Sequence, residues 1–227
     1  TAHCVKVGDA HLVADGCGAL YWPAHETLLV ADLHLEKGSH FAGLGFFLPP
    51  YDTRETLARL QRAISRYQPR RIVALGDSFH SAKGVLDIGM EDLSALHDLQ
   101  AGREWIWITG NHDPHIAERA GGVMMGALEM GGIMLRHEPQ AGETRGEIAG
   151  HLHPAAKLAR NGYVLRRPCF VGDAQRLVMP AFGAFTGGLN VRDAAFAALF
   201  APARELSVLM LGEEGLYPVA LRHLVAD

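Results

Sequence analysis

An apolar, β-prone run near the start of the chain ends in a carboxylate and an imidazole two residues apart. Residues 28–31 are Leu-Leu-Val-Ala, and Asp32 and His34 follow them. In a strand, side chains at i and i+2 point to the same side, so we expect Asp32 and His34 to reach one ion. A carboxylate with an imidazole is typical of sites for manganese, iron or zinc. The pair is a weak signal alone, and four later stretches add to it.

Each of these four stretches places polar residues directly after an apolar run that predicts a strand. They are Gly76-Asp77, Gly110-Asn111-His112-Asp113, His137 and Gly150-His151-Leu152-His153. Ligands in an α/β sheet gather beyond the carboxyl ends of the strands. We therefore expect the five stretches to meet at one edge of a sheet, with glycines where the chain turns sharply off a strand.

The candidate metal ligands are carboxylate, amide and imidazole groups, and none is a thiolate. They are Asp32, His34, Asp77, Asn111, His137, His151 and His153. Seven ligands are too many for one ion and suit two ions that share a carboxylate. Two ions about 3.5–4 Å apart clamp the attacking and leaving oxygens of a displacement at phosphorus, and they lower the pKa of a bound water toward about 7. The set therefore predicts a dinuclear centre for phosphoester hydrolysis.

The order of predicted elements indicates an α/β fold, α+β in some schemes. The first half alternates strands with helices, and from Tyr163 onward the pattern predicts strands only. We expect two sheets packed face to face as a sandwich, with helices outside. We also expect a helix that opens at a capping box formed by Asp52 and Glu55 and ends before Pro69. The length of 227 residues suits a single domain spanning 1–227.

Composition narrows the classes of protein. With 48% hydrophobic and 20% charged residues, the chain reads as globular and not as disordered. No apolar run reaches the roughly 18 residues of a membrane span, and the first residues lack a signal-peptide pattern, so we expect a cytoplasmic protein with no membrane partner. The net charge of −4 gives no basic footprint. Cys4, Cys17 and Cys169 form no paired pattern and are expected to be buried thiols.

Taken together, the five stretches resemble the calcineurin-like metallophosphoesterase superfamily and imply its fold. The resemblance implies that Asp32, His34 and His153 bind a first metal ion. It implies that Asn111, His137 and His151 bind a second, with Asp77 bridging the two. His112 matches the histidine that faces the scissile phosphate and assists the leaving oxygen, and Asp113 would orient His112.

Longer phrases resemble the bacterial ligase-associated DNA-damage-response endonucleases. These phrases are residues 32–39, 48–53 and 180–190, and the similarity covers nearly the whole chain. His80, three residues after Asp77, resembles the histidine that meets the DNA phosphate in the repair-nuclease branch. A hydrogen-bonded loop histidine is an equal alternative. The resemblance implies two divalent ions, most readily Mn²⁺, with iron or zinc as alternatives. It also implies a single-stranded DNA substrate and association with a DNA ligase and a helicase.

One departure concerns the grip on DNA, since the repair-nuclease branch carries a cap domain after the last ligand. This chain has only about seventy residues there. Arg166 and Arg167 could contact phosphates or form a solvated edge. The segment around Phe182 could stack bases, although tight packing beneath the site is favoured. The oligomeric state is left open.

The main hypothesis is a DNA endonuclease of DNA repair in which a metal-bridging hydroxide attacks phosphorus. Asn111, His112 and His80 would contact the substrate. A second hypothesis keeps the site and changes the substrate to a nucleotide, a lipid precursor or a phosphoprotein. A third is a non-catalytic scaffold for protein binding, which an intact ligand set disfavours.

Overall fold

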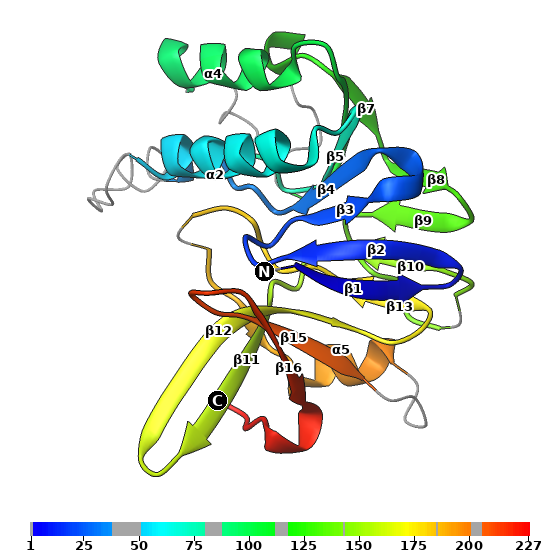
Figure 1. Cartoon of the computed structure of the whole chain (residues 1–227), viewed down its shortest axis with the longest axis vertical. Helices are drawn as coiled ribbons and strands as arrows, with labels where there is room; N and C mark the ends of the chain where they lie inside the picture. The colour runs from blue at the N-terminus through cyan, green and yellow to red at the C-terminus, as the bar shows by residue number, and fades with distance from the viewer. Residues whose placement is uncertain are drawn as a thin grey trace.

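Two sheets lie face to face in the computed structural model of the chain, with helices on their outer sides (Figure 1). The structure describes residues 2–37, 51–79, 88–111, 118–142, 144–184, 186–200 and 206–227. This arrangement confirms the predicted α/β fold with two packed sheets. That the whole chain forms one domain stays a prediction.

The first sheet carries the early site motifs and runs in sequence order from β1 to β7. Its strands are β1 (Ala2–Val7), β2 (Ala10–Asp15), β3 (Leu20–Trp22), β4 (Thr27–Ala31), β5 (Arg71–Leu75), β6 (Glu104–Ile108) and β7 (Val123–Met125). Strands β1 to β4 pair antiparallel, whereas β4 to β7 pair parallel. The carboxyl ends of β4, β5 and β6 therefore lie at one edge of this sheet.

The second sheet holds the later motifs, with the order β14-β11-β12-β13-β10-β9-β8 and with β15 paired to β12 and β16. Its strands are β8 (Ala127–Met130), β9 (Ile133–Arg136), β10 (Glu147–Ala149), β11 (Pro154–Arg160), β12 (Tyr163–Gly172), β13 (Arg176–Val178), β14 (Leu189–Asn190), β15 (Ser207–Leu211) and β16 (Leu216–Ala220). Strands β9, β10 and β13 are parallel neighbours, so their carboxyl ends also share one edge.

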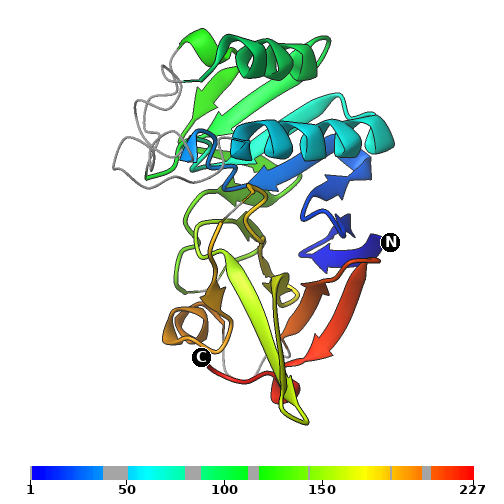
Figure 2. The ribbon, with the colours of Figure 1, turned by 90° about the vertical axis from the view of Figure 1, so that its left-hand side faces the viewer.

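Strand β12 pairs with two different strands along its length. Residues 163–168 pair with β11, whereas residues 169–172 pair with β15. Pro168 lies at the change of partner, where a residue without an amide hydrogen is tolerated. The first part of β12 forms a long hairpin with β11 that extends from the body of the protein (Figure 2).

The helices lie on the outer faces. They are α2 (Asp52–Tyr67), α4 (Met90–Gln100) and α5 (Ala194–Leu199), with 3-10 turns η1 (Pro23–His25), η2 (Glu118–Ala120) and η3 (Leu221–His223). Helix α2 ends before Pro69, as predicted. The capping-box prediction is wrong, because Tyr51 is the N-cap, no side chain caps the helix there, and Asp52 is already its first residue. The helix begins one residue early because the Glu55 amide bonds to the Tyr51 carbonyl.

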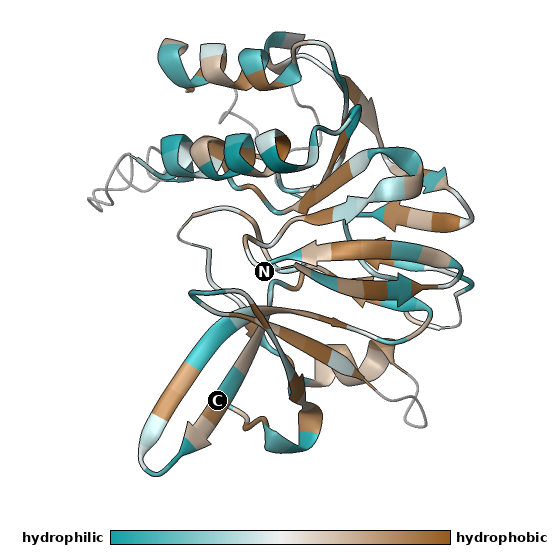
Figure 3. Ribbon diagram, viewed as in Figure 1, coloured by the Kyte–Doolittle hydropathy of each residue, from teal (hydrophilic) through white to brown (hydrophobic). Residues whose placement is uncertain are grey.

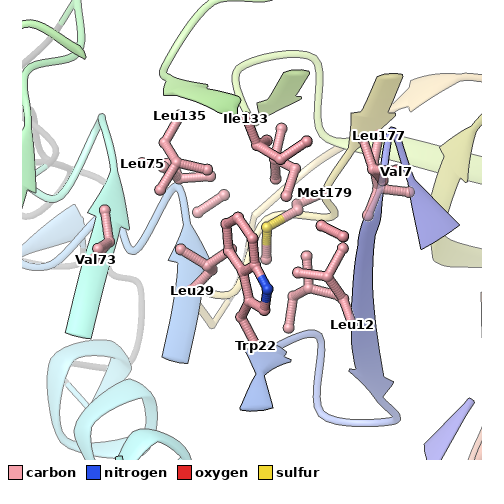
Figure 4. Packing of buried hydrophobic residues seen from close by; sticks show 14 of the residues in the cluster. Val7, Leu12, Trp22, Leu29, Val73, Leu75, Ile133, Leu135, Leu177 and Met179 are labelled. Atoms are coloured by element: carbon pink, nitrogen blue, oxygen red, sulfur yellow. The ribbon is translucent and has the colours of Figure 1, made fainter. Parts of the chain in front are cut away.

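Alternating side chains of the central strands build two cores. Leu28 and Val30 of β4 face α2 and α4, whereas Leu29 and Ala31 face the second sheet. The second set packs with residues of both sheets around Trp22 and Met179 (Figure 4). Figure 3 shows largely brown, apolar strands in the interior of the molecule. The ribbons of α2 and α4 mix teal and brown, as expected for amphipathic helices at the surface.

Three further expectations need correction. Helix α5 lies in the region predicted to hold strands only. Asp193 caps α5 by accepting a hydrogen bond from the Ala195 amide. A helix of six residues is too short for its apolar periodicity to be recognised in the sequence. Strands β7 and β8 were not predicted.

The expectation of three buried cysteines is correct only in part. Cys169 is buried and Cys17 is half-buried, but Cys4 is exposed on edge strand β1. No described helix is long and apolar enough to cross a membrane.

Candidate metal centre

Six of the seven candidate ligands come together where the two sheets meet, beyond the ends of their strands. Asp32 and His34 follow β4, and Asp77 follows β5. His137 follows β9, and His151 and His153 lie between β10 and β11. Each sheet therefore supplies three of these side chains. Their placement beyond carboxyl strand ends agrees with the general location of sites in α/β sheets.

The backbone at these positions is mostly left-handed. Among the described residues other than glycine, nine have a positive φ, and five of the nine are Asp32, His34, Asp77, His151 and His153. Such backbone costs roughly 1–3 kcal/mol per residue and is concentrated at functional sites. The sequence-based reason for the convergence of Asp32 and His34 is therefore wrong. Strand β4 ends at Ala31, and left-handed turns, not strand alternation, bring the two side chains together.

The first cluster consists of Asp32, His34 and His153. The Nε2 atoms of His34 and His153 lie 3.2 Å apart, and His153 Nε2 lies 3.5 Å from Asp32 Oδ1. Asp32 is completely buried, and the two histidines reach it from different sheets. The three side chains thus direct one ligand atom each toward a common point.

The second cluster consists of Asp77, His137 and His151. His137 Nε2 lies 3.1 Å from His151 Nδ1 and 3.5 Å from Asp77 Oδ2. The clusters adjoin one another, since Asp32 Oδ2 accepts a 2.9 Å hydrogen bond from the His151 amide and Asp32 Oδ1 lies 3.6 Å from His137 Nδ1. The two clusters are therefore neighbours that adjoin at the buried Asp32 carboxylate.

Backbone carbonyls orient two of the imidazoles. His137 Nδ1 donates to the Leu75 carbonyl at 3.1 Å, and His153 Nδ1 donates to the Gly187 carbonyl at 3.3 Å. In each ring the carbonyl fixes the proton on Nδ1 and leaves the Nε2 lone pair directed into its cluster. Histidines that bind metals almost always have such a partner on the other ring nitrogen. Sequence reasoning missed these carbonyls, because a backbone oxygen leaves no residue-type signal.

The residues fit two divalent cations. Buried Asp32 Oδ1 accepts no hydrogen bond within the described part of the chain, and a buried carboxylate oxygen is costly unless a cation or a donor satisfies it. Opposed imidazole nitrogens at 3.1–3.2 Å match the separation of about 3 Å expected for two ligands held at right angles about 2.1 Å from one ion. The all-oxygen-and-nitrogen set suits manganese, iron or zinc.

The electrostatics of His153 follow from its position. Burial, the largest single influence, lowers its pKa, but the close contact with Asp32 and the negative charge of that carboxylate together raise the pKa above its ordinary value. A proton and a cation compete for the same Nε2 lone pair. Because a ligating imidazole must be neutral, occupation of the first cluster is favoured as the pH rises.

Two of the predicted glycines are required by close packing. Gly76 has φ +73°, and a Cβ there would lie 2.3 Å from His137 Cγ. At Gly150 a Cβ would lie 2.5 Å from Asp32 Oδ2. A side chain at either position would therefore displace a member of a cluster.

The remaining predicted residues have a different status. Asn111 is exposed in the segment after β6, and the structure describes nothing that tests its role as a ligand. His80, His112 and Asp113 lie outside the described residues. Their predicted roles in catalysis and substrate binding stay predictions.

The segment after β13 packs against the backbone that carries Asp32. Phe182 is buried, its amide bonds to the Ala31 carbonyl at 2.8 Å, and the Gly183 amide bonds to the Asp32 carbonyl at 3.2 Å. This agrees with the tight packing favoured from the sequence. Glu36, which was not a candidate, is also buried here, and its side chain accepts a 2.8 Å hydrogen bond from the Thr53 hydroxyl. That contact joins the loop after His34 to helix α2.

Comparison with solved structures places this arrangement in context. The Pseudomonas putida nuclease MPE matches with a TM-score of 0.73 and 27% sequence identity, over 96% of this chain and 100% of that chain. The likeness spans nearly the whole chain. It confirms the fold and the resemblance to metallophosphoesterase nucleases that the motifs predict.

A second structure, that of the E. coli phosphoesterase Yfce, aligns with a TM-score of 0.41 and 13% identity over 88% of this chain and 96% of that chain, too low to carry an argument. No family model matches the chain. No curated protein matches it in sequence.

Proposed function

We propose that the protein is a metal-dependent phosphodiesterase of the calcineurin-like superfamily and that it cleaves single-stranded DNA internally. The observation that carries the proposal is the pair of adjoining carboxylate–imidazole clusters, each built from both sheets. The nuclease named as similar over the length of this chain supports nucleic acid as the substrate. A scaffold without catalysis would have no use for six converging ligands, five of them on strained backbone.

The chain's own residues hold and orient the reaction components. Asp32, His34 and His153 would hold one cation, and His137, His151 and Asn111 the other, with Asp77 shared between them. Two divalent cations, when bound, supply Lewis acidity toward the phosphate and a water of lowered pKa. The Leu75 and Gly187 carbonyls keep two of the imidazoles in the correct tautomer.

The residues outside the described segments complete the proposal. His112 would donate a proton to the leaving oxygen, and Asp113 would hold the His112 ring in the tautomer that this transfer needs. His80 and Asn111 would contact the phosphate. These roles rest on the sequence resemblance, as do the identity of the cations as manganese, a role in DNA repair, and association with a DNA ligase and a helicase. The proposed cytoplasmic location rests on the sequence pattern alone.

The test uses the purified chain with manganese and three substrates: circular single-stranded DNA, a bis-aryl phosphodiester and an aryl phosphomonoester. We expect the circle to be cut and the diester to be hydrolysed. Hydrolysis of the monoester alone would replace the endonuclease with a phosphatase. A protein that binds two ions and acts on none of the three substrates would favour the hypothesis of a non-catalytic scaffold.

Two variants separate the roles of the residues. His112→Ala should keep both ions and lose most turnover on DNA, whereas Asp77→Ala should lose ions and turnover together. Metal content measured on each purified variant decides the assignment. A His112→Ala protein that cut DNA as fast as the parent would contradict the role of His112.

A further inference from the structure

A cavity of about 220 Å³ opens beside the first cluster and shares His153 with it. Residues of β11 and β12 form one side of the cavity, and Ala181 with residues 186–188 forms the other. Its lining includes Arg166, Arg167 and Thr186, and no acidic residue among those described. The Arg166 guanidinium lies on this side, at the Gly188 carbonyl, whereas that of Arg167 lies toward Glu213, with which Arg167 lines a second cavity. We call the cavity beside His153 the arginine pocket. In a chain of net charge −4, it is a local concentration of positive charge next to the candidate metal centre.

Arg166 is held in place by its neighbours. Its Nη2 donates to the Gly188 carbonyl at 2.5 Å, and its Nε lies 3.5 Å from Asp227 Oδ1. Lys157 Nζ lies 3.5 Å from the same carboxylate oxygen. The two positively charged side chains thus share one side-chain carboxylate, and one positive charge is in excess. The Nη1 group of Arg166 makes no hydrogen bond within the described residues. Its donors are thus oriented before any ligand arrives, which reduces the entropy lost on binding.

Arg167 is the less engaged of the pair. The carboxylate near it is that of Glu213, at 3.6 Å, and the Glu213 side chain is 91% exposed. Such an exposed pair contributes little and is easily exchanged for a better anion. Within the described residues the Arg167 guanidinium makes no other polar contact. Because successive side chains of a strand point to opposite faces, the Arg167 guanidinium lies on the other side of β12 from that of Arg166. Arg166 is therefore the arginine whose planar fork faces the pocket, the geometry that recognises phosphate best.

Consecutive carbonyls tie the pocket to the metal centre. The Gly187 carbonyl accepts from His153, and the Gly188 carbonyl accepts from Arg166. A Cβ at Gly188 would lie 2.5 Å from the His153 carbonyl oxygen, so the loop approaches β11 as closely as a chain can. The pocket and the first cluster are therefore one connected surface, and a strand lying on one extends over the other.

We propose that the arginine pocket binds the backbone phosphate next to the one being cleaved. This inference rests on the proposed function, because it takes the occupant to be a nucleic-acid strand whose scissile phosphate lies on the clusters. The ligand class is the phosphodiester anion of a single strand, recognised by charge and fork geometry and without base specificity. The pocket would explain how a chain with an overall negative charge grips a polyanion.

The test compares a dinucleoside monophosphate, which has only a scissile phosphate, with a trinucleoside diphosphate, which has a neighbour. Wild-type protein should cleave the trinucleotide with a kcat/KM about tenfold higher, the discrimination that 1.4 kcal/mol provides. Arg166→Ala and Arg166→Lys should bring this ratio close to one, whereas Arg167→Ala, which removes the guanidinium on the other face of β12, should leave it unchanged. Arg70→Ala is the matched control, because it removes the same charge from an 83% exposed side chain paired with Glu26.

A trinucleotide with a neutral methylphosphonate in place of the neighbouring phosphate provides a second arm. Wild-type protein should lose the same factor on it, and Arg166→Ala should lose nothing more. With longer single strands, the slope of log K against log salt should be shallower by about 0.7 in Arg166→Ala, as for one phosphate contact.

The outcomes are separable. An unchanged ratio in Arg166→Ala, or an equal loss on both substrates, shows that the pocket does not bind the neighbouring phosphate and leaves the phosphodiesterase intact. Wild-type protein that hydrolyses neither substrate nor the bis-aryl diester overturns the proposed function, and the pocket with it. A ratio that falls in the Arg166 variants, and not in Arg167→Ala or Arg70→Ala, supports the inference.

Discussion

Gly76 lies between strand β5 and Asp77, with the imidazole of His137 against its Cα. A Cβ at this position would lie 2.3 Å from His137 Cγ, and the backbone has φ +73°. Gly102 has the same φ of +73°, but a Cβ there would meet none of the described residues within 4 Å. The two glycines therefore share the same backbone strain and differ only in what a methyl group would meet.

We predict that Gly76→Ala and Gly102→Ala lose similar conformational free energy, about 1–2 kcal/mol each. Only Gly76→Ala should also displace His137 and weaken manganese binding, by roughly 10- to 100-fold, as when a group that orients a ligand is lost. Manganese titration of both proteins measures the difference. Equal manganese affinities would show that His137 is not held against Gly76 in solution.

At the scale of elements, strands β10 and β13 are joined by a buried ion pair. Arg176 Nε donates to Glu147 Oε2, and both side chains are at most 3% exposed. The same guanidinium bonds to the Leu199 carbonyl at the end of α5 and to the Gln140 carbonyl. Arg71 and Glu104 form the equivalent directly opposed pair between β5 and β6, at 2.7 Å, but Glu104 is 51% exposed.

We predict that Glu147→Gln costs roughly 3–5 kcal/mol of unfolding free energy, because it leaves Arg176 as an uncompensated buried charge. Glu104→Gln should cost less than about 1 kcal/mol, since water solvates the remaining arginine. Urea denaturation of the two variants compares like with like. Similar losses in both would mean that burial does not determine the strength of these pairs.

A second contact between elements gives a pH dependence. Tyr67, the last residue of α2, donates a 2.6 Å hydrogen bond to Asp15 at the end of β2, and Arg66 Nη1 lies 3.0 Å from the same carboxylate. Burial raises the pKa of Asp15, but the bonds from Tyr67 and the Cys17 amide, together with Arg66, outweigh it and hold the pKa below its ordinary value. A carboxylate whose pKa is lower in the folded than in the unfolded chain stabilises the fold at any pH above its unfolded pKa. This stabilisation is lost as the pH falls through its folded pKa.

Tyr67→Phe should therefore cost about 1–2 kcal/mol at neutral pH, and the difference from the parent should shrink below about pH 4 as Asp15 becomes protonated. Denaturation at several pH values provides the measurement. Tyr217→Phe, with a 49% exposed ring, is the control for loss of a hydroxyl. A difference that stayed constant into acid would show that Tyr67 does not act through the Asp15 charge.

What the sequence could predict at this scale depends on how local the signal is. Strands β4, β5 and β10 come from short apolar runs, and the polar residues after them mark the site, so the carboxyl ends of these strands were predicted correctly. The capping box at Asp52 and the strand alternation of Asp32 and His34 failed. Cap geometry and left-handed turns depend on contacts from elsewhere in the chain, such as Asp32 with His151, 119 residues away.

At the scale of the whole molecule, each cluster takes ligands from both sheets. Asp32 and His34 of the first sheet meet His153 of the second, and Asp77 meets His137 and His151. The order of the motifs predicted this convergence, but not which carbonyls support it or that it joins the sheets. Because the sheets otherwise meet through apolar packing, cations held between them should stabilise the whole fold against unfolding.

We predict that manganese at about 100 times its Kd adds roughly 2.7 kcal/mol to the unfolding free energy. For a chain of this size, that corresponds to a rise in Tm of about 5–10 °C, and a chelator should reverse it. Asp32→Asn should abolish the rise while leaving the metal-free Tm equal or higher, because Asp32 Oδ1 is a buried charged oxygen that accepts no hydrogen bond in the described structure.

Asp98→Asn is the control, since Asp98 is exposed on α4 and its variant should keep the full rise with manganese. Thermal unfolding of the three proteins, each with manganese and with chelator, decides between two roles for Asp32. A structural carboxylate would lower the metal-free Tm when neutralised. A carboxylate whose main role is to hold a cation leaves the metal-free protein no weaker when neutralised, and the manganese-dependent part of the stability disappears with it.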